Sequence, residues 1–131
     1  MIEHMVNSLR KILIIDDEPA LLTLASTYFT QNGYDVKGIP NPSDIPTTLH
    51  EWTPDIILLD IIMPNINGLE VLRGLKQDPA TARIPVFIFS NLDGDDEIAE
   101  ALSTGAVGYL TKANYSLEDV QKKIEEILGK A

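Results

Sequence analysis

Carboxylates follow two short apolar runs of this sequence. Three acids at residues 16–18 come directly after the run 12–15, and Asp60 follows the run 56–59. Like-charged carboxylates at close range repel one another, so such a group takes up a proton or binds a cation. Magnesium suits carboxylate oxygens, and a carboxylate can act as a nucleophile toward phosphorus. The residue types therefore indicate metal-assisted phosphoryl chemistry.

A hydroxyl and an ammonium group follow two further apolar runs. Ser90 follows residues 86–89, and Lys112 comes shortly after the weaker run 107–110. Taken singly, each polar group has an ordinary explanation, because acids favour a helix start, serine caps helices and lysines are usually solvated. Taken together, a metal, an ammonium and a hydroxyl would stabilise the spread negative charge of a transferring phosphoryl group.

The apolar runs alternate with stretches of helical periodicity, which predicts an α/β fold. Most runs are continuously apolar, as expected for strands buried on both faces of a parallel sheet. The simplest topology is a flavodoxin-like (βα)5 three-layer sandwich with a parallel five-stranded sheet of order 2-1-3-4-5. Ligands of such sheets bind beyond the carboxyl ends of the strands, where the polar groups converge. The expected strands are residues 12–15, 36–39, 56–59, 86–89 and 107–110.

Five helices are expected between and after these strands. Leu24 and Leu102 each belong to an apolar stripe that is expected to face the core. Residues that begin or end helices delimit the segments. In chain order these are the stop Asn32-Gly33, the cap Ser43 or Asp44, the stop Asp78-Pro79, the stop Gly105 and the cap Ser116.

The composition indicates a single acidic domain. The 131 residues carry 10 Lys and Arg against 20 Asp and Glu, a net charge of -10 and a pI near 4.4. This balance argues against direct nucleic-acid or membrane binding, which needs clustered positive charge. Cysteine is absent, which excludes disulfides and thiolate chemistry. With no signal segment evident, we expect a cytoplasmic protein in which residues 1–10 are an N-terminal extension or cloning remnant and residues 11–129 form the domain.

Four motifs, in this order, resemble the receiver domain of two-component response regulators, in particular chemotaxis-regulator-like receivers. They are ILIIDDE from residue 12, DIILLDIIMP from residue 55 with Gly68 following, IPVFIFS from residue 84 and GAVGYLTK from residue 105. Each is weak alone, but the set spans about residues 11–128 at family spacing. The resemblance implies a domain that accepts a phosphoryl group on Asp60 from a histidine kinase or histidine phosphotransfer protein.

The resemblance also implies a magnesium site. Asp17 would bind Mg²⁺ directly and Asp16 mainly through a water molecule. Asp60 and the backbone carbonyl of Ile62 would be further ligands.

A switch is implied around the phosphoryl group. Lys112 would pair with it, Ser90 would hydrogen-bond to it, and Tyr109 would swing inward. The face formed by the fourth helix, fifth strand and fifth helix would then change its affinity for a downstream effector protein or domain. The sequence does not decide whether two copies dimerise through the same face.

The resemblance further implies that such a domain catalyses only its own phosphorylation and dephosphorylation and is not a turnover enzyme.

The sequence departs from the family pattern near the site. Ala113 replaces the usual proline after the lysine, which predicts a trans Lys112–Ala113 bond and a reshaped loop. Asn91 replaces a very small residue, and Ile62 is apolar where the family is often polar. Together these changes suggest restricted access of water, and hence a long-lived phosphorylated Asp60.

Other readings of the sequence are less favoured. A degenerate receiver that acts only as a phosphorylation-independent docking module conflicts with the intact set of polar residues. A flavin-binding relative would need a Ser/Thr/Gly-rich phosphate loop after the first strand. An aspartate-dependent phosphatase would need an Asp-x-Asp sequence there. The acidic run 93–97 lacks the spacing of a calcium loop and is expected to open the fourth helix.

Overall fold

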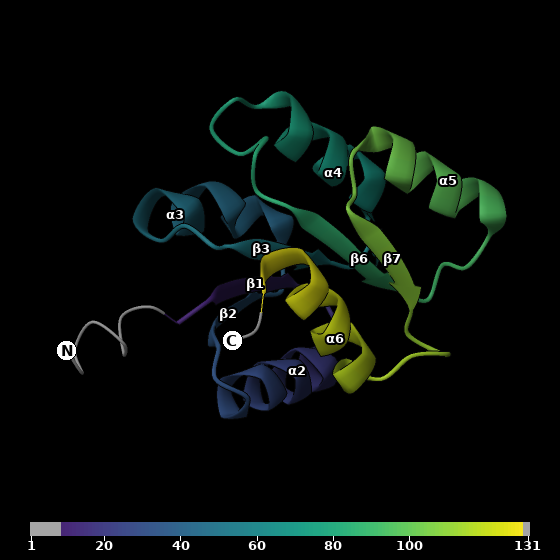
Figure 1. The fold of residues 1–131 in the computed structure, drawn as a ribbon. Helices are drawn as coiled ribbons and strands as arrows, with labels where there is room; N and C mark the ends of the chain where they lie inside the picture. The colour runs from purple at the N-terminus through teal and green to yellow at the C-terminus, as the bar shows by residue number, and fades with distance from the viewer. Residues whose placement is uncertain (1–8, 130–131) are drawn as a thin grey trace.

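A parallel five-stranded sheet lies at the centre of the computed structural model, which describes residues 9–129 (Figure 1). Its strand order is β2-β1-β3-β6-β7, which is the predicted order 2-1-3-4-5 when the strands of this sheet are counted alone. The expected flavodoxin-like fold is therefore confirmed. The strands are β1 (Lys11–Ile15), β2 (Asp35–Ile39), β3 (Ile56–Leu59), β6 (Val86–Ser90) and β7 (Gly108–Thr111).

Helices cover both faces of the sheet and complete three layers. On one face lie α2 (Pro19–Gln31) and α6 (Leu117–Leu128), as Figure 1 shows. On the other lie α3 (Ile45–Glu51), α4 (Gly68–Gln77) and α5 (Asp95–Thr104). The acidic residues 95–97 form the first turn of α5, as predicted.

Two apolar clusters hold the layers together. Successive side chains of a strand point to opposite faces, so each buried strand contributes to both clusters. Leu13 and Ile15 of β1 pack with residues of α3, α4 and α5. Ile12 and Ile14 pack with Phe29 of α2 and with residues of α6. The continuously apolar runs in the sequence reflect this burial on both faces.

Most predicted helix ends are confirmed. Asn32 is the C-cap of α2, and both Gly33 and Gly105 adopt a positive φ just after their helices. Ser116 caps α6 through a reciprocal capping box with Asp119. Gly105 has a φ of 125°, a conformation that glycine adopts without steric cost.

The predicted cap of the second helix is only partly right. Asp44 occupies the N-cap position of α3, but its side chain makes no capping hydrogen bond. Instead, Asn41 accepts a hydrogen bond from the Ser43 amide and begins a 3-10 turn, Pro42–Asp44. The turn satisfies backbone groups ahead of Ile45, so neither Ser43 nor Asp44 needs to cap with its side chain.

Two residues expected to face the core are exposed. Leu24 of α2 is 61% exposed and Leu102 of α5 is 45% exposed. Ala25 and Phe29 occupy the buried stripe of α2, and Ala101 occupies that of α5. Each predicted stripe therefore included an apolar residue that lies one position outside the buried face.

A short antiparallel hairpin follows β3, and the sequence did not predict it. Its strands are β4 (Ile62–Met63) and β5 (Ile66–Asn67), with Asn65 at a positive φ of 60° in the turn. The Asn67 side chain accepts hydrogen bonds from the amides of Leu69 and Glu70 and so begins α4. The hairpin fixes the path of the chain directly after Asp60.

Gly68 lies where this hairpin enters α4, in close contact with the backbone after Asp60. A Cβ at this position would lie 2.2 Å from the Cα of Ile61, a separation that real structures do not tolerate. Glycine is therefore required at position 68 because two backbone segments approach closely there.

The Lys112–Ala113 peptide bond is trans, as predicted.

Substitution of Gly68 by alanine is expected to lower the free energy of unfolding by about 1–3 kcal/mol, because the new methyl group collides with the Ile61 backbone. Gly74→Ala in the same helix is the matched control, since nothing lies within 4 Å of its added Cβ. That control is expected to gain about 0.5–1 kcal/mol from helix propensity. Urea unfolding measures both, and equal effects of the two substitutions would contradict the proposed packing.

Candidate functional site

The carboxyl ends of β1 and β3 hold two buried carboxylates at the point where the strand order reverses. Asp16 follows β1 and is 3% exposed, and Asp60 follows β3 and is 4% exposed. Both backbones continue the sheet, because the Asp60 amide donates to the Ile15 carbonyl and the Asp16 amide to the Ile39 carbonyl. Strand pairing therefore fixes where these two side chains begin.

Asp17 joins these two acids in a cluster of oxygen donors. One carboxylate oxygen of Asp16, of Asp17 and of Asp60 lie within 4.8 Å of one another. Asp17 is half-buried, while the other two are buried. The three acids that the sequence predicted as metal ligands are thus brought together.

Lys112 extends from the end of β7 into this cluster. Its Nζ lies 2.7 Å from Oδ2 of Asp16, 2.8 Å from Oε1 of Glu18 and 2.9 Å from Oδ2 of Asp60. The lysine side chain is 9% exposed, and those of Asp16 and Asp60 are 4% and 3% exposed. Burial of this ammonium is compensated by charge-assisted hydrogen bonds on three sides.

The other oxygen of Asp60 is held from the opposite side. Its Oδ1 accepts a hydrogen bond from the Ser90 hydroxyl at 2.7 Å and another from the Ile62 amide at 2.9 Å. Ser90 is fully buried at the end of β6. The Asp60 carboxylate is therefore fixed by partners from β6, from β7 and from the hairpin that follows it.

Burial and charge set the protonation of the cluster. Burial raises the pKa of Asp16 above its ordinary value, although the hydrogen bond from Lys112 opposes this effect. Burial also lowers the pKa of Lys112, but hydrogen bonds to the three surrounding carboxylates outweigh burial and raise that pKa. Lys112 therefore stays a cation at neutral pH and neutralises part of the acidic cluster.

Tyr109 lies beside this site. Its ring is half-buried against the core cluster, and its hydroxyl donates to the backbone carbonyl of Leu92, in the loop between β6 and α5. Burial, followed by the charges of Asp60 and Glu97, raises the pKa of Tyr109 to about 12. The phenol is thus a neutral hydrogen-bond donor at neutral pH.

Glu18, the third acid of the run after β1, was expected at this edge of the sheet but was not predicted to bind the metal or the phosphoryl group. Its side chain contacts Lys112. Ile62 contributes its amide to Asp60, and its side chain is 46% exposed. The run of three acids after β1 was the available signal for Glu18, although the run alone does not say which cation each acid faces.

The donor set fits Mg²⁺. Opposite ligands of an octahedral Mg²⁺ lie about 4 Å apart, so three oxygens within 4.8 Å of one another need only small movements to share one ion. Hard carboxylate oxygens are the donors that Mg²⁺ prefers. Asp17 is partly open to solvent, which leaves room for the water ligands that Mg²⁺ usually retains.

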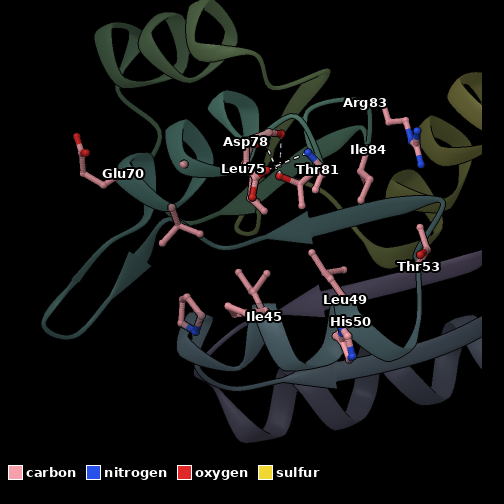
Figure 2. A pocket seen from close by; sticks show the side chains of 15 residues that line it. Ile45, Leu49, His50, Thr53, Glu70, Leu75, Asp78, Thr81, Arg83 and Ile84 are labelled. Carbon is pink, nitrogen blue, oxygen red and sulfur yellow. Dashed lines mark hydrogen bonds between the residues drawn. The ribbon is translucent and has the colours of Figure 1, made fainter.

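A cavity of about 690 Å³ lies apart from this cluster, between α3 and α4 (Figure 2). Ile45 and Leu49 of α3 line one side, and Leu75 and Ile84 line the other. Its lining includes neither the three aspartates of the acidic cluster nor Lys112.

Within residues 9–129, no helix is both long and apolar enough to cross a membrane.

The sequence matches known proteins over most of its length. Residues 12–125 match the model of the response regulator receiver domain family. The chain is 33% identical over 119 residues to protein PilH of Pseudomonas aeruginosa, and the match covers 91% of this chain and 98% of PilH. It is 30% identical to the phosphate regulon transcriptional regulatory protein PhoB of Rhizobium meliloti over 94% of this chain. The chain spans about half the length of PhoB, since the match covers 54% of that protein.

Solved structures show the same fold. The BeF3-activated N-terminal receiver domain of Klebsiella pneumoniae RstA aligns with a TM-score of 0.80 at 25% identity, covering 89% of this chain and 97% of that one. The chemotaxis protein CheY4 of Vibrio cholerae aligns with a TM-score of 0.84 at 21% identity, covering 92% of this chain and all of that one. The fold and the cluster of three aspartates are typical of a receiver domain. The chain belongs to the receiver domain family of two-component response regulators.

Substitution of Lys112 by methionine is expected to lower the free energy of unfolding by about 3 kcal/mol, because two buried carboxylates lose their cation. Urea unfolding in the presence of a chelator measures this loss. Lys122→Met is the matched control, since Lys122 and Glu118 are 68% and 71% exposed. The control is expected to change stability by less than about 1 kcal/mol. A loss at Lys112 no larger than in the control would contradict the role of Lys112 as counter-ion.

Proposed function

We propose that this domain accepts a phosphoryl group on Asp60 from a histidine kinase or a histidine phosphotransfer protein. One observation carries the proposal: Lys112 holds one oxygen of this buried carboxylate and Ser90 holds the other. A cation and a hydroxyl therefore flank the carboxylate to which a phosphoryl group would be attached. Membership of the receiver family supports the same assignment.

The chemistry assigned to Asp60 is a phosphoryl transfer. A carboxylate oxygen of Asp60 attacks phosphorus, and a P–O bond forms as the P–N bond of the donor phosphohistidine breaks. The electron pair of the broken bond stays on the imidazole nitrogen. Lys112 donates hydrogen bonds to the negative charge that spreads over the transferring oxygens, and this stabilises the transition state.

Magnesium belongs to this proposal as the cofactor. Asp16, Asp17 and Asp60, with the backbone carbonyl of Ile62, would hold it, and the ion would neutralise phosphoryl charge and orient the donor group. Asp17 is assigned as a direct ligand and Asp16 as one that acts mainly through water. The close approach of oxygens from Asp16, Asp17 and Asp60 supports a metal site that these three residues share.

Phosphorylation would act as a switch because it adds close to two negative charges at a site that Lys112 now neutralises. Ser90 and Lys112 would turn toward the new oxygens and draw with them the chain after β6 and β7. Tyr109 would exchange its bond to the Leu92 carbonyl for a more buried position. These movements would change the face formed by α5, β7 and α6, which we assign to a downstream effector.

That face already exposes apolar side chains. Leu102 is 45% exposed, Val107 46% and Ile127 36%. They surround a hollow that Tyr109 also lines. A movement of Tyr109 would therefore reshape the surface that the effector contacts.

The domain would catalyse only its own phosphorylation and, when water attacks the acyl phosphate, its own dephosphorylation.

Incubation with Mg²⁺ and acetyl phosphate is expected to add one phosphoryl group to the intact protein. Mass spectrometry detects the adduct, and the change Asp60→Asn is expected to abolish it because the acceptor oxygen is lost. Asp55→Asn is a matched control, since Asp55 caps the amino end of the neighbouring strand through the Lys11 amide and lies outside the cluster. Failure of both acetyl phosphate and a histidine kinase to produce an adduct would favour a phosphorylation-independent docking module.

The phosphorylated domain is expected to lose phosphate slowly, over minutes or longer rather than seconds. The exposed side chain of Ile62, two residues after Asp60, and that of Asn91, directly after Ser90, would hinder an attacking water. Phosphate release measured after removal of the donor gives the lifetime. Ile62→Asn is expected to shorten it, and loss of the adduct within seconds in the unmodified protein would contradict the prediction.

A further inference from the structure

Glu18 occupies an unusual position among the partners of Lys112. An ammonium group has three N–H donors, and Lys112 faces three carboxylates at 2.7, 2.8 and 2.9 Å. No donor of Lys112 is therefore free for a further partner. A phosphoryl group on Asp60 can gain a hydrogen bond from Lys112 only if one of these contacts is released.

The three carboxylates differ in what can replace the lysine as their partner. The side chains of Asp16 and Asp60 are 4% and 3% exposed, but both belong to the proposed Mg²⁺ site, so the metal ion would serve as their counter-ion when Lys112 turns to the phosphoryl group. The Glu18 side chain is 53% exposed, and water can solvate its carboxylate once it leaves Lys112. Of the three partners, Glu18 lies outside the proposed metal site and is therefore the one that would still compete with the phosphoryl group for Lys112 when Mg²⁺ is bound.

The side chain of Glu18 makes no hydrogen bond to the helix that follows it. Its amide donates to Oδ1 of Asp16 at 2.9 Å, which fixes the backbone beside the cluster. It is the N-cap residue of α2, yet its side chain makes no capping hydrogen bond. The side chain is thus committed to Lys112 and not to the amides of the helix.

We propose that Glu18 is a positioning residue that competes with the phosphoryl group for Lys112 and so disfavours the phosphorylated state. It retains one N–H of Lys112 and adds a negative charge that repels the incoming phosphoryl oxygens. This inference rests on the proposed phosphorylation of Asp60, and it assigns to Glu18 the regulation of that site. A receiver with this contact needs a larger input of phosphoryl donor to switch.

Binding of beryllium trifluoride at saturating Mg²⁺ tests the proposal, because this phosphoryl analogue activates the related RstA receiver domain. Saturating Mg²⁺ removes any effect of the substitutions on metal affinity. Glu18→Gln is expected to bind the analogue about two- to fivefold more tightly, which corresponds to the loss of one exposed ion pair. Its unfolding midpoint is expected to stay close to that of the unmodified protein, since the side chain caps nothing.

Glu18→Asp separates contact from charge. Aspartate keeps the negative charge but is one methylene shorter and prefers to cap the helix amides, so it withdraws from Lys112. It is therefore expected to bind the analogue more tightly, as Glu18→Gln does. Glu51→Gln, at the exposed end of α3, removes a charge away from the site and is expected to leave the affinity unchanged.

Three results of these binding measurements would contradict the proposed competition between Glu18 and the phosphoryl group. Unchanged or weaker binding by Glu18→Gln, with normal binding by the unmodified protein, would overturn the competition while leaving the proposed function intact. Tighter binding by Glu18→Gln but not by Glu18→Asp would overturn the role of the Lys112 contact in favour of charge alone. Absence of both analogue binding and an acetyl phosphate adduct in the unmodified protein would overturn the proposed function together with this inference.

Discussion

The salt bridges of one lysine determine the state of the whole site. Two carboxylates buried side by side would repel each other and lose their hydration, so they persist as anions only with a cation between them. Lys112 supplies that cation, at 2.7 Å from Asp16 and 2.9 Å from Asp60. Any event at Asp60, whether metal binding or phosphorylation, must therefore redistribute the hydrogen bonds of Lys112. The geometry of the surrounding strands makes this coupling unavoidable.

Strand order brings these groups together. Asp16, Asp60, Ser90 and Lys112 lie at the carboxyl ends of four different strands, and parallel pairing places all four ends on the same edge. The apolar strand residues below them are buried on both faces, which fixes the register on which the site depends. The hairpin after β3 and the close contact at Gly68 add a local constraint, because they set the path of the chain whose amide holds Asp60.

The sequence predicted the sheet well because most of the strands are continuously apolar, and residues at the carboxyl ends of parallel strands must lie at one edge of the sheet. The clustering of Asp16, Asp17, Asp60, Ser90 and Lys112 followed from that rule alone. The hairpin at residues 62–67 was missed because strands of two residues are too short to show a period. Leu24 and Leu102 were predicted to face the core because they continue the apolar spacing of their helices. In the structure the smaller neighbours Ala25 and Ala101 occupy the buried positions, and both leucines are exposed. The contact of Glu18 with Lys112 depends on side-chain direction, which residue type does not specify.

The central claim is that Lys112 exchanges its carboxylate partners for a phosphoryl group on Asp60. A crystal structure of the complex with Mg²⁺ and beryllium trifluoride tests it most directly. The account predicts the analogue on Asp60, Mg²⁺ among the three aspartates, Lys112 and Ser90 bonded to the analogue, and Glu18 released from Lys112. An analogue bound away from Asp60, or a Lys112 that keeps its bonds to both Asp16 and Glu18 beside an occupied Asp60, would contradict the account.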